Sequence, residues 1–135
     1  MSKRIKPRWL DRALVISSHY LTLCTTERGY RKVLKHLKIP KESRPAFVIN
    51  DHSHASVHFF CGPQGKQAAV VCIRDFDGKD TEAVQALIVH EAVHIWQEIR
   101  EHYGEKAPSS EFEAYAIQAL TLNLLTEFNR QTRGK

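Results

Sequence analysis

The sequence predicts an α+β domain, and three observations support that prediction. Stretches without proline carry apolar residues at helical spacing, two near the N-terminus and two in the C-terminal half. Between them lie short β-like runs, two of which flank the turn sequence Gly62-Pro63-Gln64-Gly65. A chain of 135 residues has the usual size of one domain. We therefore expect residues 1–135 to form a single domain in which helices pack on a small sheet.

Two N-terminal helices are expected before the sheet. The stretch from Trp9 to about Thr25 carries apolar residues at spacings of three and four, and Thr26-Glu27 can begin a second helix that Pro40 ends. Residues 1–8 are basic, and we expect them to be flexible. The second helix is expected to have a solvent-exposed face formed by basic residues, namely Arg31, Lys32, Lys35 and Lys38. Such a run is typical of a solvated face, and it is also a place where an acidic partner could bind.

The sheet is expected to be small and antiparallel. Phe47-Val48-Ile49 is a short strand candidate, residues 56–60 are β-like, and residues 67–73 form the most strand-like run of the chain. The last two runs flank the turn at 62–65, which predicts a hairpin.

The helix after this hairpin carries the motif His90-Glu91-Ala92-Val93-His94. Asp80-Thr81 supplies an N-cap, and Gly104 stands where a C-terminal glycine belongs. Two histidines four positions apart project from one face of a helix, about one turn apart, so two imidazoles can bind one metal ion. Glu91 lies beside them and can act on a metal-bound water. The flanks of the motif are apolar, and we expect both histidines to face the interior.

A catalytic zinc site typically has three protein ligands and one open position. A third histidine six residues after His94 is excluded, because Arg100 stands there. The last helix opens at residues 108–110 and runs to about Asn129, and Glu113 is the one charged member of its apolar stripe. A buried carboxylate needs a partner, and a metal ion is a good one.

Two alternatives to a Glu113 ligand stay open. Glu111 is the competing carboxylate, although it is rotated away from the apolar stripe and has the position of a solvated first-turn acid. Glu113 itself could instead fold back onto the backbone as part of a capping box with Ser110 as the N-cap.

The motif, followed after nineteen positions by Glu113 at the start of a helix reading Glu-Ala-Tyr-Ala, resembles the gluzincin type of zincin metallopeptidase. The blocks His-Glu-Ala-Val-His-Ile-Trp-Gln and Pro-Ser-Ser-Glu-Phe-Glu-Ala-Tyr-Ala-Ile-Gln are similar to small metallopeptidases encoded by phages and prophages. A looser similarity is to the ImmA/IrrE and SprT-like groups. The resemblance covers about residues 80–128. It implies a zincin-like fold, in which a small sheet packs on the active-site helix and the next helix delivers the Glu ligand.

The expected function is that of a zinc-dependent metallopeptidase acting on a protein or peptide substrate. His90, His94 and Glu113 would hold the zinc, and Glu91 would take a proton from the zinc-bound water and pass it to the leaving amine. Gln97 is a candidate to orient a histidine ligand. For a second donor to the oxyanion the sequence offers three candidates without choosing among them, namely Tyr115, Tyr103 and His102.

The charge of the chain bears on its binding partners, and its cysteine content bears on its cellular compartment. Lys and Arg outnumber Asp and Glu by 20 to 15, which is compatible with nucleic acid as a partner but does not favour it. The alternative function is a non-catalytic, zinc-stabilised binding domain whose basic surface binds nucleic acid or an acidic protein. Three cysteines without C-x-x-C spacing read as reduced thiols of a cytoplasmic protein. No secretory signal and no membrane-spanning run is expected, and the sequence predicts no oligomeric state.

Overall fold

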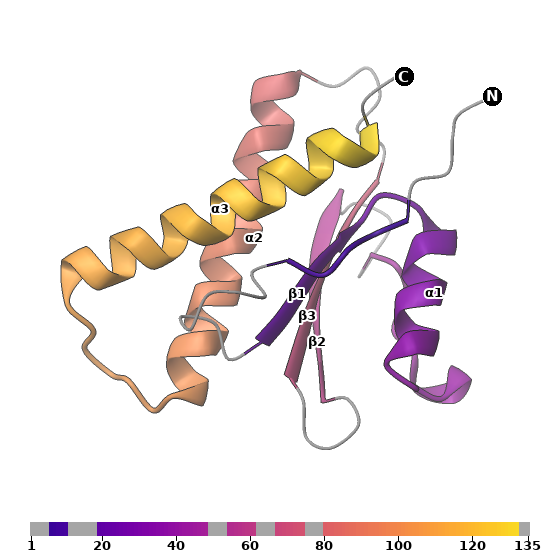
Figure 1. The fold of residues 1–135 in the computed structure, drawn as a ribbon, viewed down its shortest axis with the longest axis horizontal. Helices are drawn as coiled ribbons and strands as arrows, with labels where there is room; N and C mark the ends of the chain where they lie inside the picture. The colour runs from indigo at the N-terminus through magenta and orange to yellow at the C-terminus, as the bar shows by residue number, and fades with distance from the viewer. Residues whose placement is uncertain (1–5, 11–18, 49–53, 62–66, 75–79, 133–135) are drawn as a thin grey trace.

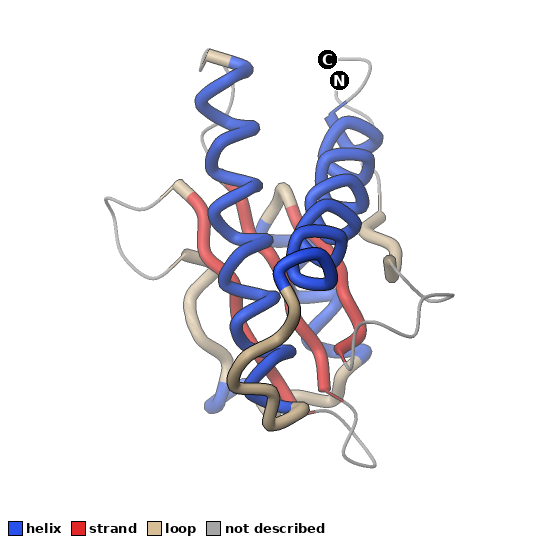
Figure 2. The backbone as a smooth tube through the Cα atoms, turned by 90° about the vertical axis from the view of Figure 1, so that its left-hand side faces the viewer, coloured by secondary structure: helices blue, strands red, loops and turns tan. Residues whose placement is uncertain are grey.

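The computed structural model describes residues 6–10, 19–48, 54–61, 67–74 and 80–132. The elements follow one another as β1 (His19–Cys24), α1 (Glu27–His36), the short 3-10 helix η1 (Lys41–Ser43), β2 (Ala55–Cys61), β3 (Gln67–Ile73), α2 (Thr81–His102) and α3 (Ser110–Thr132). The three strands form one sheet, with α1 on one face and α2 and α3 on the other (Figure 1). Figure 2 views the same layers from the side of α2 and α3, which lie in front of the strands. The predicted α+β class is therefore confirmed.

The sheet is mixed, with the strand order β1-β3-β2. The predicted hairpin is confirmed, since β2 and β3 pair antiparallel with Val57 opposite Val71. The prediction of a wholly antiparallel sheet is wrong, because β1 pairs parallel to β3 with Leu21 opposite Ala69. After β1 the chain passes through α1 and η1 and enters the sheet again as β2, which runs opposite to β1. The hairpin then reverses the chain, so β3 runs parallel to β1.

The predicted first helix, from Trp9 to about Thr25, is also wrong where it can be judged. Residues 11–18 of it lie outside the described residues, and residues 19–24 form β1. This strand is buried on both faces, since Leu21 and Leu23 belong to the core under α2 and α3 while Cys24 belongs to the core under α1. A strand with buried residues on both faces lacks the alternation of a half-buried strand, and the three-residue spacing of Leu21 and Cys24 also fits a helix.

Two further N-terminal predictions have different outcomes. The second helix is confirmed as α1, and the Thr26 Oγ1 atom caps it by accepting a hydrogen bond from the Gly29 N–H at 3.0 Å. The strand candidate at 47–49 is wrong for residues 47 and 48, which form a bend, and its third residue lies outside the described part of the chain.

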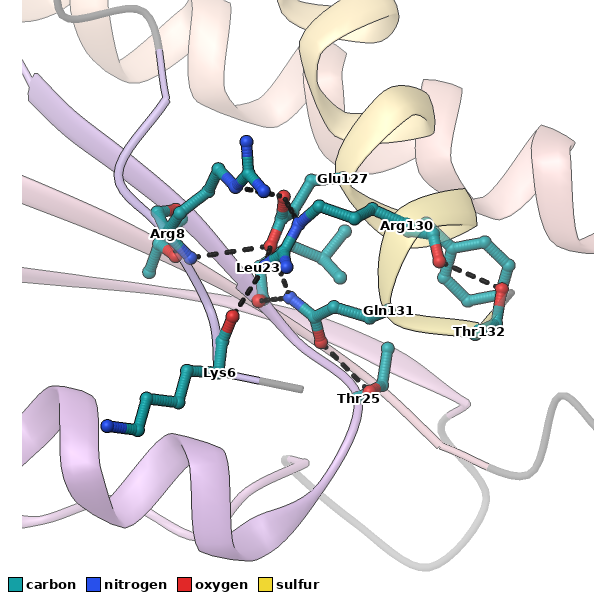
Figure 3. A network of polar contacts seen from close by, with 10 residues as sticks. Lys6, Arg8, Leu23, Thr25, Glu127, Arg130, Gln131 and Thr132 are labelled. Carbon is teal, nitrogen blue, oxygen red and sulfur yellow. Dashed lines mark hydrogen bonds and ion pairs between the residues drawn. The ribbon is translucent and has the colours of Figure 1, made fainter. Parts of the chain in front are cut away.

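A buried polar network holds the N-terminal segment and α3 together (Figure 3). The Glu127 carboxylate is 1% exposed and accepts hydrogen bonds from the Arg8 backbone N–H, from the Gln131 amide and from two nitrogens of the Arg130 guanidinium. Arg130 also donates to the Lys6 carbonyl, and Gln131 donates to the Leu23 carbonyl of β1. Residues 1–5 of the stretch predicted to be flexible lie outside the described residues, whereas Lys6 and Arg8 are held by this network.

The two long helices begin and end close to their predicted positions. Asp80 caps α2 through its Oδ1 atom, which accepts from the Glu82 N–H at 3.3 Å, and Gly104 adopts a φ of +72° after the helix. The start of α3 is capped by Ser109, whose Oγ atom accepts from the Phe112 N–H at 3.2 Å. Ser109 therefore takes the role that the capping-box interpretation gave to Ser110, and Glu113 is left for another contact.

Candidate active site

A cleft of about 450 Å³ lies between α2 and β2. The motif residues of α2 form one side of it. Its described lining consists of Ala55, Ser56, Val57 and Phe59 from β2 and His90, Glu91, His94, Gln97, Glu98 and Glu101 from α2. The packing of α2 on the sheet therefore places the motif opposite an edge strand, within one hollow.

The two histidines converge inside this cleft. Their Nε2 atoms are 3.1 Å apart, and their ring centroids are 4.6 Å apart. Both side chains are exposed, so the expectation that they face the protein interior is wrong. The physical reason is that the apolar flanks of the motif pack on the sheet and on α3, which leaves the histidine face of α2 open to the cleft.

Gln97 orients one of these rings. The His94 Nδ1 atom lies 3.2 Å from the Gln97 Oε1 atom, which can only accept a hydrogen bond, so Nδ1 carries the proton. The Nε2 atom of His94 then presents a lone pair toward His90. A ligand histidine needs this tautomer, and a hydrogen bond from its other nitrogen commonly fixes it. This contact agrees with the prediction that Gln97 orients a histidine ligand.

Glu91 lies beside the pair but is buried, with 5% of its surface exposed. Burial raises the pKa of the Glu91 carboxyl, and the neighbouring His90 and His94 act against that shift. Glu91 is one of the residues that line the same cleft as His90 and His94. Its place fits a group that exchanges protons with a molecule held in the cleft rather than a solvated surface acid.

Glu113 lies elsewhere in the structure. Its Oε2 atom accepts a hydrogen bond from the Trp96 indole N–H at 2.8 Å. Trp96 follows His94 by two residues and therefore points about 200° away from it around α2. Glu113 accordingly faces the side of α2 that packs on α3, and neither it nor the exposed Glu111 lines the cleft. Within the described part of the chain, no three His, Cys, Asp or Glu side chains are grouped so that they could hold a metal ion.

The residues that are brought together fit half of a zinc site. Two nitrogens at about 2.05 Å from a tetrahedral zinc lie about 3.3 Å apart, and the observed separation of the two Nε2 atoms is 3.1 Å. The third ligand is not assembled, because Trp96 engages Glu113. The cleft offers other carboxylates close to the pair along the helix, since Glu98 and Glu101 both line it.

Sequence reasoning missed these two acids and the wall formed by β2. Helical spacing could have predicted the two acids, because Glu98 lies four residues and Glu101 seven residues after His94, on the same face of α2. The β2 wall had no local signal, because only the packing of α2 on the sheet brings it to the motif.

The three candidates for an oxyanion donor do not line the cleft. Tyr103 and Tyr115 are 53% and 61% exposed, and His102 stacks edge-on against His19 with ring centroids 5.5 Å apart.

No family model, no curated protein and no solved structure matches the chain. The described helices include none with both the length and the apolar character that crossing a bilayer requires.

Proposed function

We propose that the protein is a zinc-dependent metallopeptidase of the zincin type that hydrolyses a protein or peptide. One observation carries the proposal: the Nε2 atoms of His90 and His94 lie 3.1 Å apart in a cleft that the buried residue Glu91 also lines. A bound zinc would supply Lewis-acid polarisation of the scissile carbonyl and would lower the pKa of water. The chain's own residues supply the rest of the chemistry.

Each side chain of the motif has a distinct role in this proposal. His90 and His94 hold the metal through their Nε2 atoms, and Gln97 keeps the proton of His94 on Nδ1. Glu91 acts as the general base that accepts a proton from water in the cleft, and then as the acid that delivers it to the leaving amine nitrogen.

The third ligand is proposed to be Glu113, on the grounds of its spacing after the motif. To reach the histidines its carboxylate must release the Trp96 indole N–H, from which it accepts a hydrogen bond at 2.8 Å, and must move from the α3 side of α2 to the cleft side. Glu98 is the competitor, because it already lines the cleft and follows His94 by one helical turn. The two carboxylates can be tested against each other.

The opposite wall of the cleft supports an extended peptide as the substrate. Among the described strands β2 lies at the edge of the sheet, and four of its residues line the cleft. An extended peptide can add to such an edge through backbone hydrogen bonds, which give affinity without demanding one sequence. Phe59, which is 36% exposed, offers an apolar contact for a substrate side chain at the same wall.

The experiment that tests the proposal measures zinc first and hydrolysis second. The purified chain is loaded with zinc, freed of excess metal and analysed for metal content, alongside Glu113→Gln, Glu98→Gln and the matched control Glu105→Gln, which changes an exposed acid outside the cleft. We expect one zinc per chain in the wild type and the control, with retention lost in Glu113→Gln. Loss in Glu98→Gln instead would reassign the third ligand while leaving the zinc site in place.

Hydrolysis is then followed with a quenched-fluorescent peptide library. In Glu91→Gln we expect zinc to be retained and the rate to fall by about 10²- to 10⁴-fold, the usual contribution of a positioned general base. A wild-type chain that holds no zinc after loading would refute the proposal. So would a Glu91→Gln variant that cleaves peptides as fast as the wild type.

A further inference from the structure

The helix α1 packs on the other face of the sheet (Figure 1), and a second hollow is lined by residues of α1 and by residues at η1. Its volume is about 620 Å³. It is lined by six cationic residues, Arg28, Arg31, Lys32 and Lys35 of α1 together with Lys41 and Arg44 at η1. We call this the basic hollow. The sheet separates it from the cleft that holds the histidine pair, so it needs an explanation of its own.

Local structure holds these cations together. The opposite face of α1 is fixed in the core by Tyr30, Val33 and Leu34, so its basic side chains point outward along one stripe. On the η1 side, the Arg44 Nε atom donates to the Ile39 carbonyl at 2.9 Å, which positions the guanidinium. The basic hollow is thus built by two elements of the fold, α1 and η1.

The cations of the basic hollow have little compensation from the protein. No acidic residue is among its described lining residues. Arg31 pairs with Glu27 at 3.7 Å, but both side chains are more than 60% exposed and such a pair contributes little. Six like charges around one hollow repel one another, and a polyanion placed there would relieve that repulsion.

The chemistry of the lining favours nucleic acid over an acidic protein. The core of a protein–protein interface is depleted in lysine and rich in apolar and aromatic groups, whereas every described residue that lines the basic hollow is Lys or Arg. From Arg28 to Lys35 the stripe extends about 10 Å along α1, which is long enough to contact more than one phosphate of a duplex strand. Arginine binds phosphate through two parallel hydrogen bonds, and three of the six residues are arginines.

The lining also indicates which form of nucleic acid fits. Single strands are usually held by aromatic side chains that stack on the bases, and no aromatic residue is among the described lining. Tyr30 and Phe47 are near in sequence but buried. We propose that the basic hollow docks the phosphate backbone of a double-stranded nucleic acid without reading its base sequence. This site is independent of the metallopeptidase proposal.

The test measures binding of two fluorescently labelled 20-base-pair DNA duplexes of unrelated sequence by anisotropy, between 50 and 200 mM salt. The affected variant is Lys32→Gln/Lys35→Gln, which neutralises two exposed residues of the basic hollow. The matched control is Arg100→Gln/Lys106→Gln, which removes the same charge from the C-terminal end of α2 and the turn after it. Each phosphate contact contributes about 0.9 to the slope of log affinity against log salt. We therefore expect the slope of the first variant to fall by about 1.8 and that of the control to stay unchanged.

Several results would overturn the proposal. They are the absence of duplex binding at 50 mM salt, an equal loss in both variants, and equally tight binding of a polyglutamate of matched charge. Equal affinity for the two duplexes is the expected result, and a large difference between them would contradict backbone-directed docking. The Glu91→Gln variant should bind DNA like the wild type, so failure of the peptidase proposal leaves this measurement intact.

Discussion

Replacing Glu127 with Gln tests the buried network that joins α3 to the N-terminal segment (Figure 3). The substitution keeps the size of the side chain but removes its charge and turns one oxygen into an N–H donor. Four N–H groups converge on the two carboxylate oxygens, at distances from 2.6 to 3.3 Å. Whichever oxygen is replaced, the new amide nitrogen therefore faces at least one donor.

The expected loss of stability can be estimated from these contacts. Hydrogen bonds to a charged group contribute about 1.5–3 kcal/mol, against about 1 kcal/mol for neutral ones, and a buried donor without an acceptor costs about 1–3 kcal/mol. Glu127 is 1% exposed, but the Arg130 side chain is 27% exposed and can be partly rehydrated. We expect Glu127→Gln to lower the free energy of unfolding by about 3 kcal/mol, the lower end of the range for breaking a buried pair.

Urea unfolding followed by far-UV circular dichroism measures this loss, and thermal unfolding should show a midpoint about 10 °C lower. The matched control is Glu105→Gln, an exposed acid in the turn after α2, for which a change within about 0.5 kcal/mol is expected. Arg130→Met and the double variant complete a cycle that isolates the pair. A loss below about 1 kcal/mol in Glu127→Gln would show that the network does not stabilise the fold and would refute this reasoning.

Three further predictions concern the core and the surroundings of the candidate site. Leu124→Ala, at a fully buried position of α3, should cost about 2–5 kcal/mol in urea unfolding, and a cost below 1 kcal/mol would contradict the packing described. Burial, with a smaller effect of His102, lowers the pKa of His19 to about 4 from 6.5, so the unfolded chain binds more protons between these values. The free energy of unfolding should therefore fall as the pH drops below about 6.5, by about 2 kcal/mol at pH 5. The difference between the free energies of unfolding at pH 7 and pH 5 should be smaller in His19→Gln. An unchanged difference would contradict the lowered pKa of His19. Trp96→Phe should lower the thermal midpoint by an amount equivalent to about 1–2 kcal/mol, because it leaves Glu113 without its indole donor, whereas Glu113→Gln keeps an acceptor for that indole and should cost less.

Local signals in the sequence determined α1, α2, α3 and half of the candidate site. The N-cap at Asp80 and the glycine at 104 set the ends of α2 through contacts within a few residues, so the motif could be placed on a helix from the sequence alone. Four-residue spacing on that helix then brings His90 and His94 together, because helical geometry is the same wherever the helix packs. The β2–β3 hairpin was also predictable, since its turn lies between two adjacent strand-like runs.

Only the tertiary structure decided the remaining features, because each depends on residues far apart in the chain. Residues 19–24 form a strand since β3 offers them a parallel partner and helices bury them from both sides, which no local pattern shows. The partner of Glu113 depends on how α3 crosses α2, and that crossing turns it toward Trp96. The basic hollow likewise needs η1 to fold back beside α1, so that two separate runs of basic residues line one surface.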